Sequence, residues 1–443
     1  MKKMFIFLVF GMLLSNVDTS TAQNVAGVPL TTKYRRSSLH TMLIDNDNFP
    51  KRDTVIHAYN NAPFPDKYND HNIGIKTLTF QDYNITDEER AAFGMHSKSK
   101  IGSLFAKEDT ADVKNKELPI LISKYFKRNK VANKLVAKWF NRNEDGAFST
   151  NLLAERGSYD ASSMEASIAK SSALGSASLA DAGEELIGNT FVVCSKLSFV
   201  SNEIAARVIR ATAYAVAEQK LSGFPLLIAK KAADIVYNKA SEGYSVWTHS
   251  YLFKLQWNDS IASIFYNNYY FDKNSIDKVK KENFDNTDLF KMEYIGYQKS
   301  RSLVTFSFKK GEGHRTEEQM ITLATVRNVD NVFSKLQREY DIFMPKVPLF
   351  TGSPITAKIG MKEGLEGGEK FEVLEQTMDP KSGLTKYKRV GEIKVSKKQI
   401  WDNRFQMDQA DAAGEKSDKV LDRTFFDGSD DKFFAGMLIK QIK

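Results

Sequence analysis

Cysteine is almost absent from this 443-residue chain, and long uncharged apolar runs are scarce. Cys194 is the single cysteine, so no disulfide can form within the chain. Beyond the first residues, the most nearly apolar stretch covers 204–236, but charged side chains and a Ser-Gly-Phe-Pro break interrupt it. We therefore expect neither disulfide stapling nor a transmembrane helix.

Recognisable catalytic motifs are lacking as well. The chain has no G-x-S-x-G motif, and its histidines show no H-E-x-x-H or other metal-binding spacing. The histidines are His40, His57, His71, His96, His249 and His314. Cys194 lies in the apolar run FVVCS, where a thiol behaves as a small hydrophobic side chain. We expect no catalytic residue, no cofactor and no metal site. A hydrolase whose carboxylates meet only in the folded chain is the alternative.

The N-terminus has the three parts of a secretory signal peptide. Lys2 and Lys3 form a positive region, and the apolar segment 4–14 that follows is too short to span a bilayer. Ser20 and Ala22 supply the small residues of a cleavage site. We expect a signal peptide at 1–22, a mature chain that starts with Gln23, and export without a lipid anchor, because no cysteine follows the apolar segment.

Positive charge is concentrated in one part of the chain. The formal net charge is +8, and residues 114–142 carry nine Lys and Arg against the single acidic residue Glu117. Lysines at helical spacing form one face there: Lys127, Lys130, Lys134 and Lys138. Such a face attracts phosphate-bearing lipid heads or another polyanion, and the export signal argues against nucleic acid. The alternative is a solvated face opposite a buried apolar stripe.

Periodicity predicts an α+β fold with a change of character near residue 348. We expect an irregular segment at 23–113, an α/β main domain at 114–348 with helices packed on a mixed sheet, and a small β-barrel-like domain at 349–443. The predicted helices are at 53–60, 118–143, 160–187, 202–220, 226–240 and 328–343. The predicted strands are at 35–44, 189–200, 244–257, 302–310, 370–378, 386–395 and 433–443. Thr86 and Glu89 have the spacing of a capping box.

A glycine-rich loop precedes one of these strands. Residues 360–376 read GMKEGLEGGEKFEVLEQ. A phosphate-binding loop needs Ser or Thr after its lysine and then a helix, but Lys370 is followed by phenylalanine and a strand pattern. We predict that Gly364, Gly367 and Gly368 serve backbone geometry and bind no nucleotide.

Two short loops gather acidic and amide side chains. The segment PDKYNDHN contains Asp66, Asn69, Asp70 and His71, and DGSDD covers 427–431. These residue types can bind a cation, but the spacing is not that of an EF-hand. Asp and Asn in loops more often bond to their own backbone, which is the interpretation we favour for the first loop. For 427–431 we favour a solvated turn.

Many stretches together resemble an uncharacterised family of exported envelope proteins from Gram-negative bacteria. They are TKYRRSSLHTML, PFPDKYNDHNIG, LLAERGSYDA, DAGEELIGNTFVVC, ATVRNVD, LQREYDIF, KIGMKEGLEGGEKFEVLE, YKRVGEIK and IWDNR. More distantly, the helix-then-strand core is similar to curli-secretion-channel (CsgG-like) and flagellar assembly T proteins. The latter open a small C-terminal β-barrel with a comparable glycine-rich pattern. The missing lipid-anchor cysteine departs from the curli-type pore.

The resemblance implies a protein of the periplasm or cell surface of a Gram-negative bacterium. It assigns no activity, so it carries over no catalytic residue. We expect a non-enzymatic protein that acts through contacts with other envelope proteins or with further copies of itself, in a cell-surface or secretion assembly. The alternatives are the hydrolase named above and a peripheral binder of anionic envelope surfaces that uses the lysine face.

Overall fold

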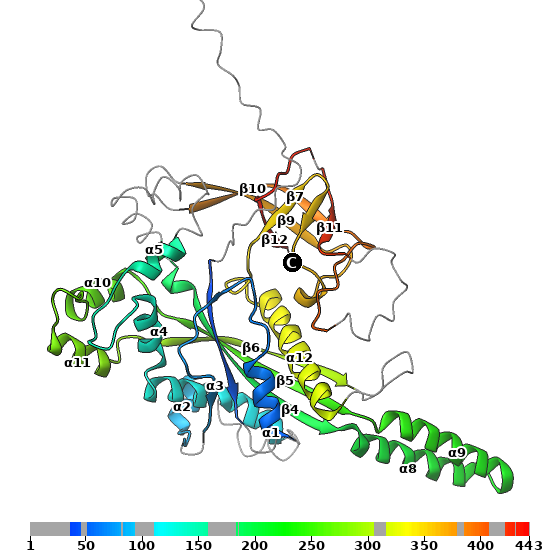
Figure 1. Cartoon of the computed structure of the whole chain (residues 1–443). Coiled ribbons are helices and arrows are strands. Elements are labelled where there is room, and N and C mark those ends of the chain that lie inside the picture. Colours follow the sequence, from blue (N-terminus) through cyan, green and yellow to red (C-terminus); the bar gives the residue numbers. More distant parts are fainter. Residues whose placement is uncertain are drawn as a thin grey trace, which may run out of the picture.

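The computed structural model describes residues 36–45, 51–80, 83–93, 110–157, 183–184, 186–304, 316–378, 385–406, 421–429 and 431–442. Within them the chain is a mixed α+β protein with two sheets (Figure 1). The predicted signal peptide and most of the predicted helix at 160–187 lie outside the described residues, so both stay predictions.

The first sheet is mixed, and its strands lie in the order β2-β1-β4-β5-β6, with β3 paired to β1. β1 is parallel to β2, β3 and β4, whereas β5 is antiparallel to both β4 and β6. The bounds are Ser38–Ile44 (β1), Asn69–Asp70 (β2), Thr77–Leu78 (β3), Thr190–Ser201 (β4), Tyr244–Leu255 (β5) and Met292–Val304 (β6). The strands predicted at 35–44, 189–200 and 244–257 are confirmed, but β6 begins well before the predicted 302–310.

Helices cover both faces of this sheet. Because side chains alternate along β4, its successive residues enter the cores on opposite faces. Val192 and Cys194 join one core with α3 (Thr110–Arg128), α4 (Val131–Trp139), α10 (Asp259–Asn268) and α11 (Lys278–Asn286). Phe191 and Val193 join a second core with α12 (Glu317–Glu339). α1 (Arg52–Asn60) packs on the α12 side. Cys194 is fully buried and burial raises the pKa of its thiol, as expected for a thiol inside an apolar strand.

The single helix predicted at 118–143 is wrong: the chain breaks it between α3 and α4. Lys130 has φ 51°, a left-handed conformation that a continuous α-helix cannot contain. The new direction carries Val131, Leu135 and Trp139 into the core, where all three are fully buried. The helices α10 and α11 were not predicted.

The remaining short helices are α2 (Asp87–Ala92) and α5 (Asn151–Gly157). The predicted capping box begins α2: the backbone N–H of Glu89 donates to Thr86 Oγ1 at 3.3 Å, and the N–H of Thr86 donates to Glu89 Oε2 at 2.9 Å. A one-turn 3₁₀ helix at Ile187–Asn189 leads into β4.

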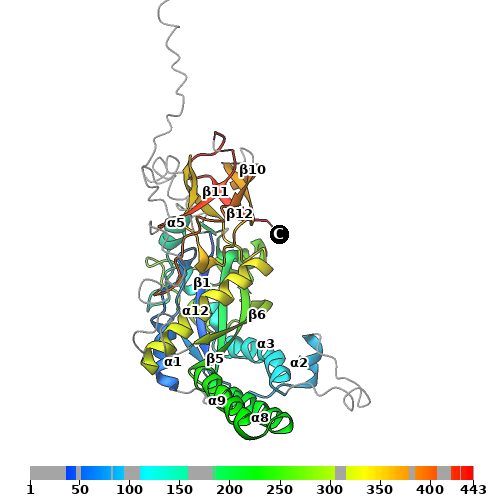
Figure 2. The ribbon, with the colours of Figure 1, turned by 90° about the vertical axis from the view of Figure 1, so that its right-hand side faces the viewer.

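Two long helices form a hairpin that connects β4 to β5. They are α8 (Asn202–Lys220) and α9 (Gly223–Ala240), and they confirm the helices predicted at 202–220 and 226–240. Figure 1 shows the pair projecting away from the sheet, and Figure 2, which looks nearly along the pair, shows it at one end of the molecule.

The second sheet is a closed ring of six antiparallel strands in the order β10-β11-β8-β7-β12-β9. The bounds are Val347–Gly352 (β7), Ile355–Ala357 (β8), Lys370–Met378 (β9), Thr385–Val395 (β10), Thr424–Asp427 (β11) and Leu438–Gln441 (β12). The ring encloses its own apolar cluster, which includes Leu349, Val373 and Val395. The strands predicted at 370–378 and 386–395 are confirmed. Only the end of 433–443 is a strand, and β7, β8 and β11 were not predicted.

Candidate functional site

The glycine-rich loop turns the chain into β9, as the sequence predicts. Gly364 and Gly368 have φ of 75° and 92°, in the left-handed region that favours glycine. A Cβ atom at Gly367 would lie 2.8 Å from Cα of Lys397, closer than real Cβ contacts. All three glycines therefore have a backbone role.

The same loop fastens the ring to α12. Arg338 of α12 donates a hydrogen bond to the carbonyl oxygen of Gly364 and pairs with Glu369 at 2.8 Å. Lys370, the lysine that a phosphate site would use, is an exposed strand residue and pairs with Glu392 at 3.2 Å. The loop is a structural junction.

His71 is buried with both ring nitrogens occupied. Its Nε2 lies 2.9 Å from the carbonyl oxygen of Leu135, and its Nδ1 lies 2.7 Å from Nη1 of Arg156. A carbonyl only accepts and a guanidinium only donates, so Nε2 carries the proton and Nδ1 accepts. Burial, and then the charge of Arg156, lower the pKa of His71 well below its usual range, which keeps the ring neutral. No nitrogen lone pair is left for a metal.

Arg156 joins several elements around this histidine. Besides His71, its guanidinium donates to Ser38 Oγ at 2.8 Å and to the carbonyl oxygen of Asp70 at 3.4 Å. It also lies over the ring of Trp139, 4.3 Å from the centroid. The arginine thus cross-links α5, β1, β2 and α4, which is a structural task.

The loop at 66–72 bonds to its own chain, as the sequence predicts. Asp70 Oδ1 accepts from the N–H of Asn72 at 3.0 Å, and Asn72 Oδ1 accepts from the N–H of Gly74 at 2.8 Å. Asp66 pairs with Lys67 at 2.8 Å. The other loop, 427–431, begins at the end of β11 and includes a residue outside the described part. Among the described residues, no three His, Cys, Asp or Glu side chains are grouped so that they could hold a metal ion.

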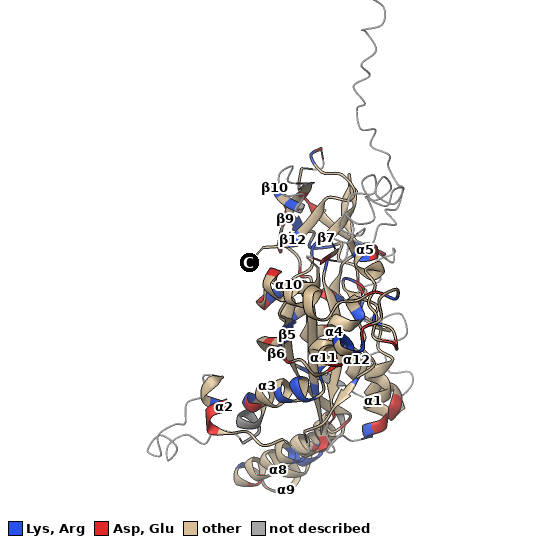
Figure 3. Cartoon of the chain, turned by 90° about the vertical axis from the view of Figure 1, so that its left-hand side faces the viewer, with Lys and Arg blue, Asp and Glu red and all other residues tan. Residues whose placement is uncertain are grey.

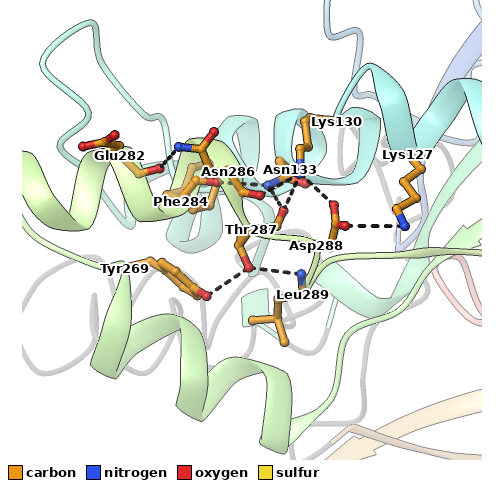
Figure 4. A network of polar contacts seen from close by, with 10 residues as sticks. All are labelled: Lys127, Lys130, Asn133, Tyr269, Glu282, Phe284, Asn286, Thr287, Asp288 and Leu289. Atoms are coloured by element: carbon orange, nitrogen blue, oxygen red, sulfur yellow. Dashed lines mark hydrogen bonds and ion pairs between the residues drawn. The ribbon is translucent and has the colours of Figure 1, made fainter.

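The four lysines predicted as one basic face have different surroundings. The basic residues of α3 are visible along the ribbon in Figure 3. Lys127 and Lys130 share Asp288, at 3.5 and 2.7 Å, and Lys130 also donates to the carbonyl oxygens of residues 286 and 287 (Figure 4). Lys138 is partly buried and donates to the carbonyl oxygen of residue 72, while Lys134 is exposed. Three of the four ammonium groups already have internal partners, so the geometry gives the polyanion prediction no support.

A small, partly enclosed cavity lies beside β1. Its volume is about 140 Å³, and Asp70 is the only carboxylate among its described lining residues. His40 also lines it, and burial lowers the pKa of His40 to about 4, so its ring is neutral at neutral pH. The cavity does not bring together the two carboxylates that the hydrolase alternative needs.

The inner side of the α8–α9 hairpin is polar. Tyr214 donates to Asp234 at 2.7 Å, and Lys230 pairs with Glu218 at 2.6 Å. Two further contacts cross between the helices: Arg210 reaches Asp234 at 3.6 Å, and Tyr237 donates to Glu203 at 3.2 Å. On α8 these residues are Glu203, Arg210, Tyr214 and Glu218, at intervals of seven, four and four positions, so one helix face carries the contacts to α9.

The outer side of the hairpin is apolar and faces solvent. On α8, Ile204 and Val208 are each 63% exposed, and on α9, Phe224 is 73% exposed. The other large exposed apolar residues of the hairpin are Ile209, Val216, Leu221, Leu227, Ile228, Ile235 and Val236. A helix of a globular protein normally turns its apolar face to the core and its charges to water. This hairpin does the reverse.

A shallow groove of about 700 Å³ follows the outer side of α8. Its apolar wall includes Val208, Ile209, Val216 and Leu221, and Lys220 lies at its end. Contiguous exposed apolar surface of this kind marks an interaction site on a soluble domain. We therefore take the outer face of α8 as the candidate functional site.

An open sheet edge lies near the base of the hairpin. β6 pairs with β5 alone among the described strands, so it forms one edge of the first sheet. The edge is not wholly free, because the N–H of Tyr297 donates to the Tyr340 hydroxyl at 3.1 Å and the carbonyl of Lys299 accepts from Lys335 at 3.0 Å. An edge strand of this length is a second surface on which another chain can pair.

Sequence reasoning found both hairpin helices but not their function. It judged 204–236 only as a candidate membrane span, and no helix in the described part of the chain is long and apolar enough to cross a membrane. The missed signal is that the charges of α8 recur at Glu203, Arg207 and Arg210, and that each is followed by an uncharged residue: Ile204, Val208 and Ala211. The pattern separates two faces, but it does not say which one meets solvent.

Comparison with known proteins adds no assignment. No protein-family model matches the chain, and no curated protein matches it significantly.

Proposed function

We propose that this chain is an exported envelope protein of a Gram-negative bacterium that acts without catalysis, through protein–protein contacts. The observation that carries the proposal is the outward apolar face of α8. Ile204, Val208 and Val216 lie on it in helical register and are exposed. Leaving such side chains in water forgoes about 1.5–3 kcal/mol each, which a partner that covers them recovers.

The partner is another envelope protein or a further copy of this chain. The open edge of β6 supports the same class of function, because it offers backbone hydrogen bonds to an incoming strand. The hydrolase alternative has no comparable support. Its nearest candidate cavity has Asp70 as the only carboxylate among the described lining residues. Outside that cavity, the buried His71 meets Arg156 instead of an acid.

We also infer that the six-stranded ring is a small β-barrel-like domain at 349–443 that follows an α/β main domain. This main domain begins before the expected residue 114, because β1, β2 and β3, from the segment expected to be irregular, belong to its sheet. Support comes from the separate apolar cluster inside the ring and from the start of its first strand at Val347. In this arrangement the ring and the hairpin lie at different parts of the molecule (Figure 1), so they can serve different contacts.

The experiment that tests the proposed function is a charge substitution on the α8 face. Val208→Glu should leave the melting temperature nearly unchanged, because Val208 is exposed. It should remove the native complex of this chain from gently solubilised envelopes, as seen by size on native electrophoresis. Val279→Glu is the matched control, since Val279 is 69% exposed on α11, outside the hairpin.

A complex that persists with Val208→Glu would contradict the proposal. So would a hydrolytic activity of the purified chain that is lost with Asp70→Asn, because that result would assign the function to the cavity beside β1.

A further inference from the structure

The distal end of the hairpin is an uncharged apolar segment that is separate from the outer face of α8. We define the hairpin tip as residues 221–228, which read LSGFPLLI and carry no charge. Phe224 is 73% exposed and Leu227 is 64% exposed, and Leu221 and Ile228 are exposed as well. Four large exposed apolar side chains thus lie around the turn of the hairpin, and this turn projects away from the rest of the protein (Figure 1).

Positive charge flanks the tip on both sides. Lys220 precedes it and Lys230 and Lys231 follow it, and no acidic residue occurs between Glu218 and Asp234. Lys220 and Lys231 are exposed. The two nearest acids are held between the helices, Glu218 by Lys230 at 2.6 Å and Asp234 by Tyr214 at 2.7 Å. The charge left beside the tip is therefore basic.

These two features together fit one kind of surface. An apolar protrusion with a basic border matches the apolar interior and the anionic headgroups of a lipid bilayer. A second copy of the chain fits less well, because two tips that met would bring their lysines together without acids to offset them. The hairpin is not a membrane span, since both helices carry charges and none of the described helices meets the length and hydropathy of one.

We propose that the hairpin tip inserts into the interfacial layer of an anionic lipid bilayer, with Phe224 and Leu227 below the headgroups and Lys220 and Lys231 at their level. The polar contacts between α8 and α9 are consistent with insertion, because they hold the two helices together and leave the apolar side chains of the tip free to contact lipid. The proposal concerns the tip and goes beyond the protein contacts assigned to the face of α8.

Vesicle binding by the full chain tests this proposal. We expect sedimentation with vesicles that contain phosphatidylglycerol, and weaker sedimentation with pure phosphatidylcholine. Phe224→Asp should weaken the binding about tenfold or more, because it puts a charge where the proposal places an aromatic ring inside the bilayer. Val279→Asp is the control, since it changes an apolar side chain of similar exposure on α11 and should bind like the parent. Val208→Glu should also bind vesicles, which separates this proposal from the proposed function.

A fluorescent label reports insertion directly. The native thiol of Cys194 is fully buried with a raised pKa, so an environment-sensitive label on a Phe224→Cys variant attaches at one site. We expect its emission to increase and shift to the blue on anionic vesicles, and a label on a Val279→Cys variant to stay unchanged. Equal vesicle binding by the parent and Phe224→Asp would overturn the proposal. Unchanged emission at position 224, or a tip-dependent oligomer without vesicle binding, would also overturn it.

Discussion

Gly364 shows how a single residue fixes the junction between the ring and α12. Its φ of 75° is open to glycine and costly for alanine, and a Cβ atom there would lie 2.4 Å from Ser334 Oγ. We predict that Gly364→Ala lowers the free energy of unfolding by about 1 kcal/mol or more. Lys370→Ala should change it by less than about 0.5 kcal/mol, because Lys370 is an exposed strand residue.

Equilibrium unfolding in urea of these two variants beside the parent checks the prediction, with titration of ATP and GTP as a second measurement. Saturable nucleotide binding that disappears with Lys370→Ala would show that the loop is a phosphate site instead.

Asp330 of α12 makes the stability depend on pH. Burial raises the pKa of its carboxyl from about 3.8 to about 7, and Lys362 at 3.8 Å only partly opposes this. Glu363 and Asp66 add negative charge nearby and raise the pKa further. Between about pH 4 and pH 7, the Asp330 carboxyl is therefore protonated in the folded chain and ionised in the unfolded chain.

A raised carboxyl pKa gives stability that is fully present below the unfolded pKa and is lost as the pH rises through the folded value. We predict that the parent loses on the order of 2 kcal/mol more stability between pH 5 and pH 8 than Asp330→Asn does. Urea unfolding of both proteins at these two pH values measures the difference. Parallel pH profiles would show that Asp330 does not titrate in this range.

At the scale of single elements, the helices α8 and α9 could be predicted because local chemistry sets their ends. Ser201 caps α8 by accepting from the N–H of Glu203 at 3.3 Å, and Leu221 and Ser222 separate the two helices. The predicted Gly-Phe-Pro break instead forms the first turn of α9, which therefore begins three residues before the predicted 226. The break after α3 could not be predicted. Lysine is a good helix former, and Lys130 leaves the helix because its ammonium group binds Asp288 and two carbonyls of a segment distant in sequence.

The hairpin itself depends on few cross-helix contacts. Asp234 meets both Tyr214 and Arg210 of α8, so Asp234→Ala removes two of them. We predict a loss of about 0.5–1.5 kcal/mol of local stability in both hairpin helices. Hydrogen exchange should be faster along α8 and α9, while the amides of β4 and β5 keep their protection. Exchange that quickens equally in the strands would mean that the hairpin and the sheet open as one unit.

At the scale of the whole molecule, the sequence indicated two consecutive regions: one with helices mixed with long strands, and then one with short strands alone. The α+β class and the long strands β4 and β5 followed from alternation and helical periodicity, whereas most of β6 was missed. A small β-barrel-like domain was predicted as well, but not all of its strands. β8 and β11 are only three and four residues long, too short to show a period. The candidate surface on α8 escaped prediction for another reason, since amphipathic spacing does not show which face a neighbour covers.

The division near residue 348 has its own test. We predict that residues 346–443, expressed alone, give strand-type circular dichroism and a cooperative melt, because the ring has a closed strand order and its own apolar cluster. A disordered spectrum would mean that the ring requires α12, which it contacts through Arg338 and Glu369.

The most direct test of the outer face of α8 as a contact surface is a scan of single photo-crosslinking residues along this helix in intact cells. We predict strong adducts at Ile204, Val208 and Val216, which face outward, and weak ones at Arg210 and Tyr214, which face α9. Adduct yield should therefore follow the helical period of about 3.6 residues. An absence of adducts at every outward position, or yields with no such period, would contradict a protein–protein function for this surface.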